Sequence, residues 1–249
     1  MPELDPRKSF ADHVQRLKEK HDPETAMSLA VGGRFEEAGL VEADLLLHYG
    51  LQSGHYVIDV GCGSGRLAWA LSKRRRVDQL RYLGTDVVPD LVDYAARLAG
   101  RSDWKFAVVN EINIPEGDAQ ADFVCFFSVF THLLHEHSYL YLKEAQRVLK
   151  PRGKILFSFL EYAIHWEIFQ NSVADMTSTR PLNVFMSKED IAEWTRHLGL
   201  EIVTITRGDE LSIPLTEPVI FEHGIATRDK VAFGQSFCVL TAPPSQEVK

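Results

Sequence analysis

The residues best placed for chemistry lie in the segment VIDVGCGSGRLAWAL, residues 57–71. Gly61, Gly63 and Gly65 occupy every second position between an apolar run and a run with helical periodicity. Glycines at a strand-to-helix junction leave room for a ligand beside the backbone, and a helix N-terminus favours negative charge. We therefore predict that backbone N–H groups of this turn face a bound ligand.

An acidic residue further along the chain narrows the class of ligand. Asp86 ends the strand-like segment RYLGTD, and it follows Gly61 by 25 positions. A carboxylate at the end of the second strand of such a sheet can accept hydrogen bonds from both ribose hydroxyls. The order of strand, glycine turn, helix, strand and acid therefore predicts a nucleoside ligand.

The spacing of the glycines separates two kinds of nucleoside cofactor. They read G-x-G-x-G, whereas a turn that binds a pyrophosphate reads G-x-G-x-x-G. Asp59 lies two residues before Gly61, where its carboxylate would repel a phosphate and attract an ammonium group. This pattern favours a cofactor with a zwitterionic amino-acid tail over NAD, and an NAD-dependent oxidoreductase is the weaker alternative.

These residues require a sheet covered by helices on both faces. The segments YVIDV, FVCFF and ILFSF are almost continuously apolar, as expected of strands buried on both sides. Strands and helices alternate from about residue 37, which predicts right-handed crossovers and a mostly parallel sheet. The segment after Glu161 reads as irregular until a helix begins behind Ser187. No helix separates the last two strands, 200–207 and 236–242, so they are expected to pair antiparallel.

Four segments together resemble the class I S-adenosylmethionine-dependent methyltransferases: VIDVGCGSG, LGTDVVPDLVDYA, ADFVCFFSVFTHL and RVLKPRGKILFS. The resemblance covers about residues 38 to 240. It implies a doubly wound, Rossmann-like α/β fold with a seven-stranded, mostly parallel sheet and an antiparallel last strand. We expect a methyltransferase domain at 38–249, preceded at 1–37 by a helix and an active-site lid.

The resemblance also implies where S-adenosylmethionine would bind and S-adenosylhomocysteine would remain as product. Asp59 and the backbone of 61–65 would hold the methionine part, Asp86 the ribose, and Val87 the adenine. Asn110 stands where the family often carries Asp, so a carboxylate is missing there. The full set of cofactor residues is Asp59, Gly61, Cys62, Gly63, Gly65, Asp86, Val87, Asn110, Glu111, Ile112 and Ser128.

The residues expected at the methyl acceptor follow strands four and five. His132 is the candidate general base, although a packing or binding role stays open. Arg34 and Phe35, behind the glycine pair 32–33, would reach the site from the lid, and Glu161, Tyr162 and His165 would contact the acceptor. We expect no metal, because His137 would point away from His132 and His135 on a helix and no fourth ligand is evident.

Composition limits the partners of this 249-residue chain. Its net charge is -8, and KRRR at 73–76, expected to be a solvated helix end, is its only basic run, which argues against nucleic acid. It has no apolar run long enough to span a membrane, and its three cysteines lie far apart. We expect a cytoplasmic monomer or homodimer.

Two motifs that are absent from the sequence narrow the class of methyl acceptor. The N-P-P-Y tetrapeptide of base-modifying enzymes and the Pro-Cys nucleophile of cytosine-C5 enzymes are both absent. Aromatic residues gather near the ends of strands four and five instead. We therefore expect methylation of an oxygen or nitrogen of a small aromatic or apolar metabolite, the alternative being a cofactor-binding protein that transfers no methyl group.

Overall fold

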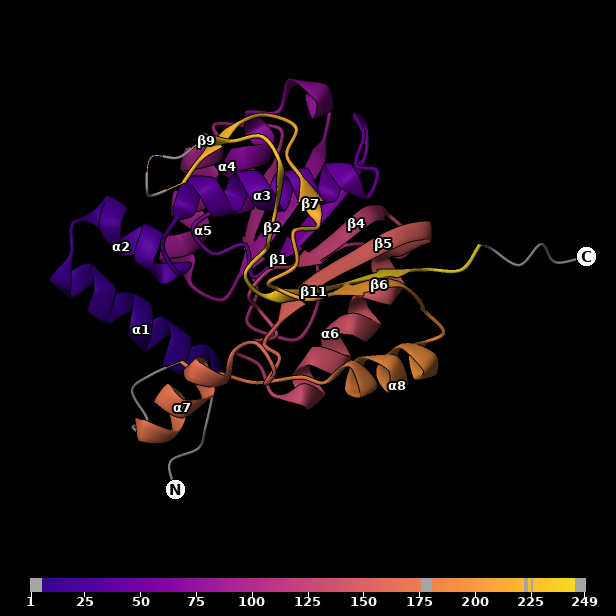
Figure 1. Ribbon diagram of the computed structural model, residues 1–249. Helices are drawn as coiled ribbons and strands as arrows, with labels where there is room; N and C mark the ends of the chain where they lie inside the picture. The colour runs from indigo at the N-terminus through magenta and orange to yellow at the C-terminus, as the bar shows by residue number, and fades with distance from the viewer. Residues whose placement is uncertain (1–5, 176–180, 222–223, 225, 245–249) are drawn as a thin grey trace, which may run out of the picture.

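The computed structural model describes residues 6–175, 181–221, 224 and 226–244, and its centre is a twisted seven-stranded sheet (Figure 1). The strand order is β3-β2-β1-β4-β5-β11-β6, and β11 runs antiparallel to β5 and β6 while the other pairs are parallel. The strands are β1 Tyr56–Val60, β2 Arg81–Asp86, β3 Lys105–Val108, β4 Ala121–Phe126, β5 Leu149–Phe159, β6 Glu201–Thr206 and β11 Ser236–Thr241. The predicted fold class is confirmed.

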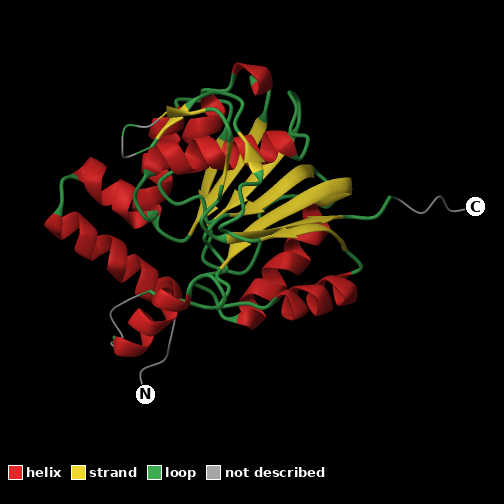
Figure 2. Ribbon diagram, in the orientation of Figure 1, coloured by secondary structure: helices red, strands yellow, loops and turns green. Residues whose placement is uncertain are grey.

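Helices cover both faces of the sheet (Figure 2). They are α1 Pro6–Lys20, α2 Pro23–Ala30, α3 Phe35–His48, α4 Arg66–Ser72, the 3₁₀ turn η1 Arg75–Val77, α5 Pro89–Ala99, α6 His135–Val148, α7 Trp166–Ala174 and α8 Lys188–Leu198. Neighbouring strand residues such as Val57 and Ile58 enter different cores, one shared with α3 and α4 and the other with α6 and α8. This alternation explains why the central strands are apolar at nearly every position.

The connection between β6 and β11 contains two short antiparallel pairs. β7 Ile213–Pro214 pairs with β10 Lys230–Val231, and β8 Val219–Ile220 pairs with β9 Ala226–Thr227. The two closing strands pair antiparallel as predicted, with β11 inserted between β5 and β6. Because this connection returns to the carboxyl ends of β4 and β5, it brings late residues of the chain to the site.

Three local expectations need correction or comment. The segment after Glu161, which reads as irregular, contains the helix α7. Arg74 of the basic run is buried, not solvated, and pairs with Asp44 at 2.9 Å and with Glu217 at 3.1 Å. Helix α3 begins at Phe35 and therefore crosses the expected boundary between 1–37 and 38–249.

Candidate active site and cofactor cleft

The glycine turn joins β1 to α4, but its N–H groups bind the chain itself. Gly61 and Cys62 donate to the carbonyl oxygen of Thr85, at 2.7 and 2.9 Å. Gly63 donates to Oδ2 of Asp86 at 2.9 Å. The prediction that N–H groups of this turn face a ligand is therefore wrong for these three residues. Their hydrogen bonds tie the turn to the end of β2.

The glycines are required by backbone conformation and packing. Gly61 and Gly65 have φ values of +71° and +87°, a region that residues with a Cβ rarely adopt. A Cβ at Gly61 would lie 2.5 Å from Cγ2 of Val129, and one at Gly65 would lie 2.7 Å from the Cα of Ala95. Gly65 thus allows α4 to pack against α5, a role that differs from making space for a ligand.

Asp86 lies at the carboxyl end of β2 and is buried. Its Oδ1 accepts the N–H of Val88 at 3.0 Å, and its Oδ2 accepts the N–H of Gly63. Burial raises the pKa of Asp86, while these backbone hydrogen bonds oppose the rise. Each carboxylate oxygen keeps a second lone pair, so the residue suits two adjacent ribose hydroxyls.

Asp59 is buried on β1, where its Oδ2 accepts the hydroxyl of Tyr82 at 2.6 Å. Burial raises its pKa to about 7, and the nearby carboxyl of Glu42 adds to this rise. Glu42 is itself buried and paired with Arg66, which also donates to the carbonyl of Val31 at 2.8 Å. A buried group of acids whose neighbouring arginine is already paired with Glu42 favours a ligand that brings positive charge.

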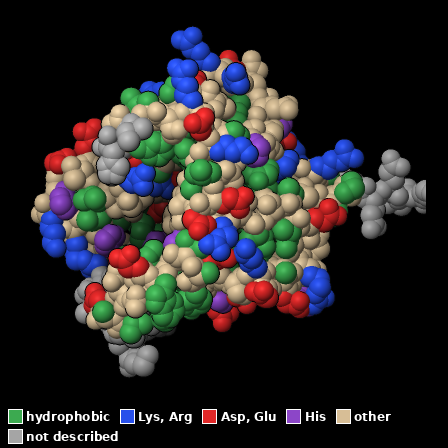
Figure 3. All heavy atoms as spheres, in the orientation of Figure 1, with side chains coloured by type: hydrophobic (Ala, Val, Ile, Leu, Met, Phe, Trp, Pro, Cys, Tyr) green, Lys and Arg blue, Asp and Glu red, His purple; other side chains and the backbone are tan. Residues whose placement is uncertain are grey.

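Two adjoining cavities open above these acids, of about 440 and about 180 Å³. Figure 3 shows a hollow beside the N-terminal helices on this face of the molecule. Both cavities are lined by Phe10, Gly61, Asp86, Ser128 and His132. Most of the other residues around the smaller cavity are apolar or aromatic: Val60, Val87, Val109, Ile112, Val129, Leu133 and Tyr141, with Thr85, Glu111 and His137.

The smaller cavity is therefore a largely apolar space beside Asp86. Val87, Glu111 and Ile112 line it as the sequence suggested. Asn110 is exposed and lies outside both linings, between Val109 and Glu111, which lie within them.

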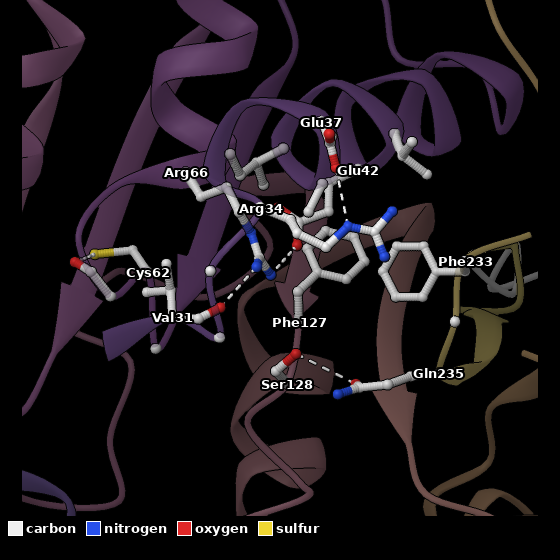
Figure 4. A pocket seen from close by; sticks show the side chains of 18 of the residues that line it. Val31, Arg34, Glu37, Glu42, Cys62, Arg66, Phe127, Ser128, Phe233 and Gln235 are labelled. Carbon is white, nitrogen blue, oxygen red and sulfur yellow. Dashed lines mark hydrogen bonds and ion pairs between the residues drawn. The ribbon is translucent and has the colours of Figure 1, made fainter. Parts of the chain in front are cut away.

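The larger cavity extends past the glycine turn between the ends of β4 and β11 (Figure 4). Phe127, Phe221 and Phe233 supply aromatic surface, and the rings of Phe127 and Phe233 lie 5.6 Å apart. Ser128 has a φ of +59°, which is uncommon for a residue with a side chain and marks local strain at this edge. The phenylalanine rings give this part of the cavity an aromatic surface.

His132 lines both cavities and has a fixed tautomer. Its Nδ1 lies 2.6 Å from the carbonyl oxygen of Leu182. A carbonyl can only accept, so Nδ1 carries the proton and Nε2 of the neutral ring keeps a lone pair. Burial lowers the pKa of His132, and the ring stacks on Phe10 with centroids 6.0 Å apart. His132 is thus neutral at pH 7 and chemically able to accept a proton.

Arg34 also lines the larger cavity, between the glycine pair and α3. Its Nε donates to Oε2 of Glu37 at 2.9 Å (Figure 4). Its guanidinium lies 5.8 Å from the centroid of the Phe221 ring. Phe35 lies outside both linings and packs against Trp69, with ring centroids 6.1 Å apart. Of the two residues expected from the lid, the structure brings Arg34 alone to the cavity.

The three residues expected after β5 lie outside both cavity linings. Tyr162 is 51% exposed and stacks on Phe185. His165 accepts the N–H of Glu161 at Nδ1 and donates from Nε2 to the carbonyl of Gly234 at 2.9 Å. Glu161 accepts the hydroxyl of Ser236. Glu161 and His165 therefore hold the start of β11 in place, and contact with an acceptor remains a prediction.

Sequence reasoning missed several residues of the larger cavity: Phe10, Glu37, Glu42, Arg66, Phe221, Phe233 and Gln235. Arg66 directly follows the third glycine of the turn, and this position alone could have placed it in the candidate site. Phe221, Phe233 and Gln235 come from the irregular connection before β11, where sequence periodicity gives no direction. Among the described residues, no group of three or more His, Cys, Asp or Glu side chains could hold a metal ion. No helix in the same part of the chain could cross a membrane.

Comparison with known proteins agrees with this geometry. The methyltransferase domain family matches residues 58–157. A tRNA N(3)-methylcytidine methyltransferase of Schizosaccharomyces pombe is 26% identical over 166 residues, which are 61% of this chain and 66% of that protein. A ubiquinone biosynthesis O-methyltransferase of Coxiella burnetii is 25% identical over 161 residues, with the same coverage. The matched region thus spans 66% of the length of these curated relatives.

Solved structures share the fold. The magnesium protoporphyrin IX methyltransferase of Synechocystis, with bound S-adenosylhomocysteine, superposes with a TM-score of 0.62 at 15% identity, covering 95% of this chain and 97% of that chain. A chain of the complex between the Haloferax volcanii Trm112 methyltransferase activator and a methyltransferase gives a TM-score of 0.65 at 20% identity, covering 98% and 100%.

Residues 58–157 thus match the methyltransferase domain family, and the fold around them is shared with solved methyltransferase structures. The family match and these structural neighbours support a class I S-adenosylmethionine-dependent methyltransferase with S-adenosylmethionine as its cofactor. The resemblance noted in the sequence is confirmed.

Proposed function

We propose that this protein transfers the methyl group of S-adenosylmethionine to an oxygen or nitrogen atom of a small aromatic or apolar metabolite. The observation that carries this proposal is the larger cavity of about 440 Å³. It adjoins the cofactor acids on one side, is lined by four phenylalanine rings, and includes a histidine with a free lone pair. A planar acceptor fits such a surface.

The cofactor residues divide the cleft by chemistry. Asp86 receives the ribose hydroxyls, and the apolar residues around Val87 and Ile112 cover the adenine. The carboxyl of Asp59 faces the methionine ammonium, because both lie next to the glycine turn. Two N–H groups of Arg66 are already bound to Glu42 and Val31, and we assign Arg34, which also lines the larger cavity, to a carboxylate of the cofactor or the acceptor.

When bound, the cofactor supplies an electrophilic methyl group on a sulfonium sulfur. The chain's contribution is alignment of the acceptor in line with that bond, which lowers the barrier through orientation. His132 Nε2 accepts the proton that the acceptor O–H or N–H loses as its bond to the methyl carbon forms and the sulfur–methyl bond breaks. The Leu182 carbonyl holds the imidazole in the tautomer needed for this step.

The known proteins similar to this chain suggest tRNA as a second class of methyl acceptor. One is a tRNA methyltransferase, and one structural neighbour comes from a complex with a methyltransferase activator. The net charge of -8 and the acids in the cleft disfavour a polyanion in this chain. We therefore place the small metabolite first, and methylation of tRNA enters as an outcome of the test.

The test has two stages. Calorimetric titration with S-adenosylhomocysteine, and in parallel with NADH, is expected to give micromolar binding of the former only. Incubation with S-adenosylmethionine and a panel of phenols, carboxylates and aromatic amines is expected to yield S-adenosylhomocysteine and a methylated product. Binding without turnover on this panel or on tRNA would favour a cofactor-binding protein, and NADH binding alone would favour an oxidoreductase.

A further inference from the structure

A small polar network joins β5 to the residues that follow β4 and precede β11, at the wall of the larger cavity. Ser158 on β5 receives the N–H of Ser128 on its Oγ at 2.7 Å, and its Oγ lies 2.6 Å from Oε1 of Gln235. The Ser128 hydroxyl also donates to this oxygen, at 3.2 Å (Figure 4). Ser128 and Gln235 both line the cavity. The network therefore places one amide at the wall of the acceptor space.

The protons of the network fix which way the Gln235 amide faces. Ser158 is fully buried, so its single hydroxyl proton needs an acceptor. One lone pair of its oxygen is already used by Ser128 N–H, and the adjacent Gln235 carbonyl oxygen supplies the acceptor. Both serine hydroxyls thus point at Oε1. The two N–H donors on Nε2 remain, and they bind no residue in the described part of the chain.

The backbone around Gln235 is held firmly. The N–H of Gly234 donates to the carbonyl of Gly208 at 2.8 Å, and the carbonyl of Gly234 accepts His165 Nε2–H at 2.9 Å. Ser236 accepts the N–H of Gly208 at 3.1 Å and donates to Glu161. The amide is therefore presented by a fixed strand end, which lowers the entropic cost of using it to bind a ligand.

The neighbouring surface indicates what this donor meets. Phe233, two residues before Gln235, lines the same cavity and packs against Phe127. A ring lying on these phenyl groups would bring its substituents toward the polar network. Nε2 of Gln235 offers donors but no acceptor, so it complements an oxygen on that ring and not a further N–H or O–H donor.

We propose that Gln235 recognises the methyl acceptor by donating a hydrogen bond from Nε2 to a second oxygen atom on its ring, separate from the atom that is methylated. The acceptor class is thereby narrowed to aromatic rings that carry a carbonyl, carboxylate or phenolate oxygen beside the nucleophile. This inference rests on the proposed function, because it concerns the acceptor of that same reaction.

The test removes the donor on the protein and, separately, the oxygen atom on the methyl acceptor. Gln235→Glu keeps an oxygen for both serine hydroxyls but removes the Nε2 donors. The acceptor pairs are 2-hydroxyacetophenone with 2-ethylphenol, and 2-aminoacetophenone with 2-ethylaniline, in which a methylene replaces the carbonyl. Gln79→Glu, the same substitution at an exposed site, is the matched control. Binding to the complex with S-adenosylhomocysteine and kcat/KM are both measured.

For the native protein and Gln79→Glu, the carbonyl compound of each pair is expected to bind and react at least about tenfold better, the scale of one hydrogen bond in a desolvated site. Gln235→Glu is expected to lose this preference while its Tm and its affinity for S-adenosylhomocysteine stay unchanged. An equal preference in Gln235→Glu, or none in the native protein, would overturn the inference while leaving methyl transfer intact. Turnover of no acceptor at all would overturn the proposed function together with it.

Discussion

Replacement of Asp59 by Asn should stabilise the ligand-free protein and weaken cofactor binding. Asp59 is buried, and its pKa rises from 3.8 to about 7. The folded protein thus binds this proton more tightly than the unfolded chain does. Its contribution to stability is complete below pH 3.8 and is lost as the pH rises through 7. A shift of about 3 units corresponds to at most about 4 kcal/mol.

Asn can still accept the Tyr82 hydroxyl but carries no charge to bury. The free energy of unfolding of Asp59→Asn should therefore exceed that of the native protein at pH 8 and approach it near pH 4. Urea denaturation across this pH range measures both. Asp93→Asn, at an exposed position of α5, is the control and should leave the pH dependence unchanged.

The affinity for the cofactor should rise with pH, whereas the contribution of Asp59 to stability falls with pH. The methionine ammonium favours ionised Asp59, so affinity for S-adenosylhomocysteine should rise with pH up to about 7, and binding at pH 7 should release protons. Calorimetry in two buffers of different ionisation enthalpy measures that release. Asp59→Asn should lose at least about tenfold in affinity at pH 8, as for a charge-assisted hydrogen bond. The reasoning fails if the variant binds as tightly as the native protein or shows the same pH dependence of stability.

Three further substitutions probe other parts of the cleft. Asp86→Ala should weaken S-adenosylhomocysteine binding by at least about 1.5 kcal/mol in calorimetry, and unchanged affinity would contradict the ribose assignment. His132→Ala should lower kcat about 100-fold or more with little change in cofactor affinity, and equal losses of kcat and affinity would make His132 a binding residue. The kcat of the native protein should fall only below pH 6.5, since burial lowers the pKa of His132. Gly65→Ala should be clearly less stable to urea than Gly100→Ala, because both have positive φ but only the former meets Ala95; equal losses would refute the packing argument.

The sequence predicted the sheet well because its signals are local and strong. The buried strands near Val57, Phe123 and Leu156 are apolar on both faces, which specifies central parallel strands. The capping box of Ser187 and Asp190 was visible as a pattern and marks the start of α8. Asp86 was identified because the end of the second strand fixes its position relative to the glycine turn.

The acceptor side was harder to predict because its residues meet only through tertiary structure. Phe233 and Gln235 reach the cavity from a connection with no regular periodicity, and their neighbours Phe127 and Ser128 lie more than 100 positions earlier. Glu161 and His165 were expected to contact the acceptor because they follow β5, yet their hydrogen bonds run to the backbone and side chains at the start of β11. The glycine N–H groups were expected to face a ligand, but register between β1 and β2 lets Thr85 and Asp86 bind them.

The most direct test of the account is a transfer assay with S-adenosylmethionine that carries an isotope label in its methyl group. Purified protein is incubated with the cofactor and the panel of phenols and aromatic amines, and both products are followed by mass spectrometry. The account predicts labelled methyl on an aromatic oxygen or nitrogen, in equal amount to the S-adenosylhomocysteine formed, and strongly reduced in His132→Ala. Tight cofactor binding with label on tRNA alone, or on no acceptor, would contradict it.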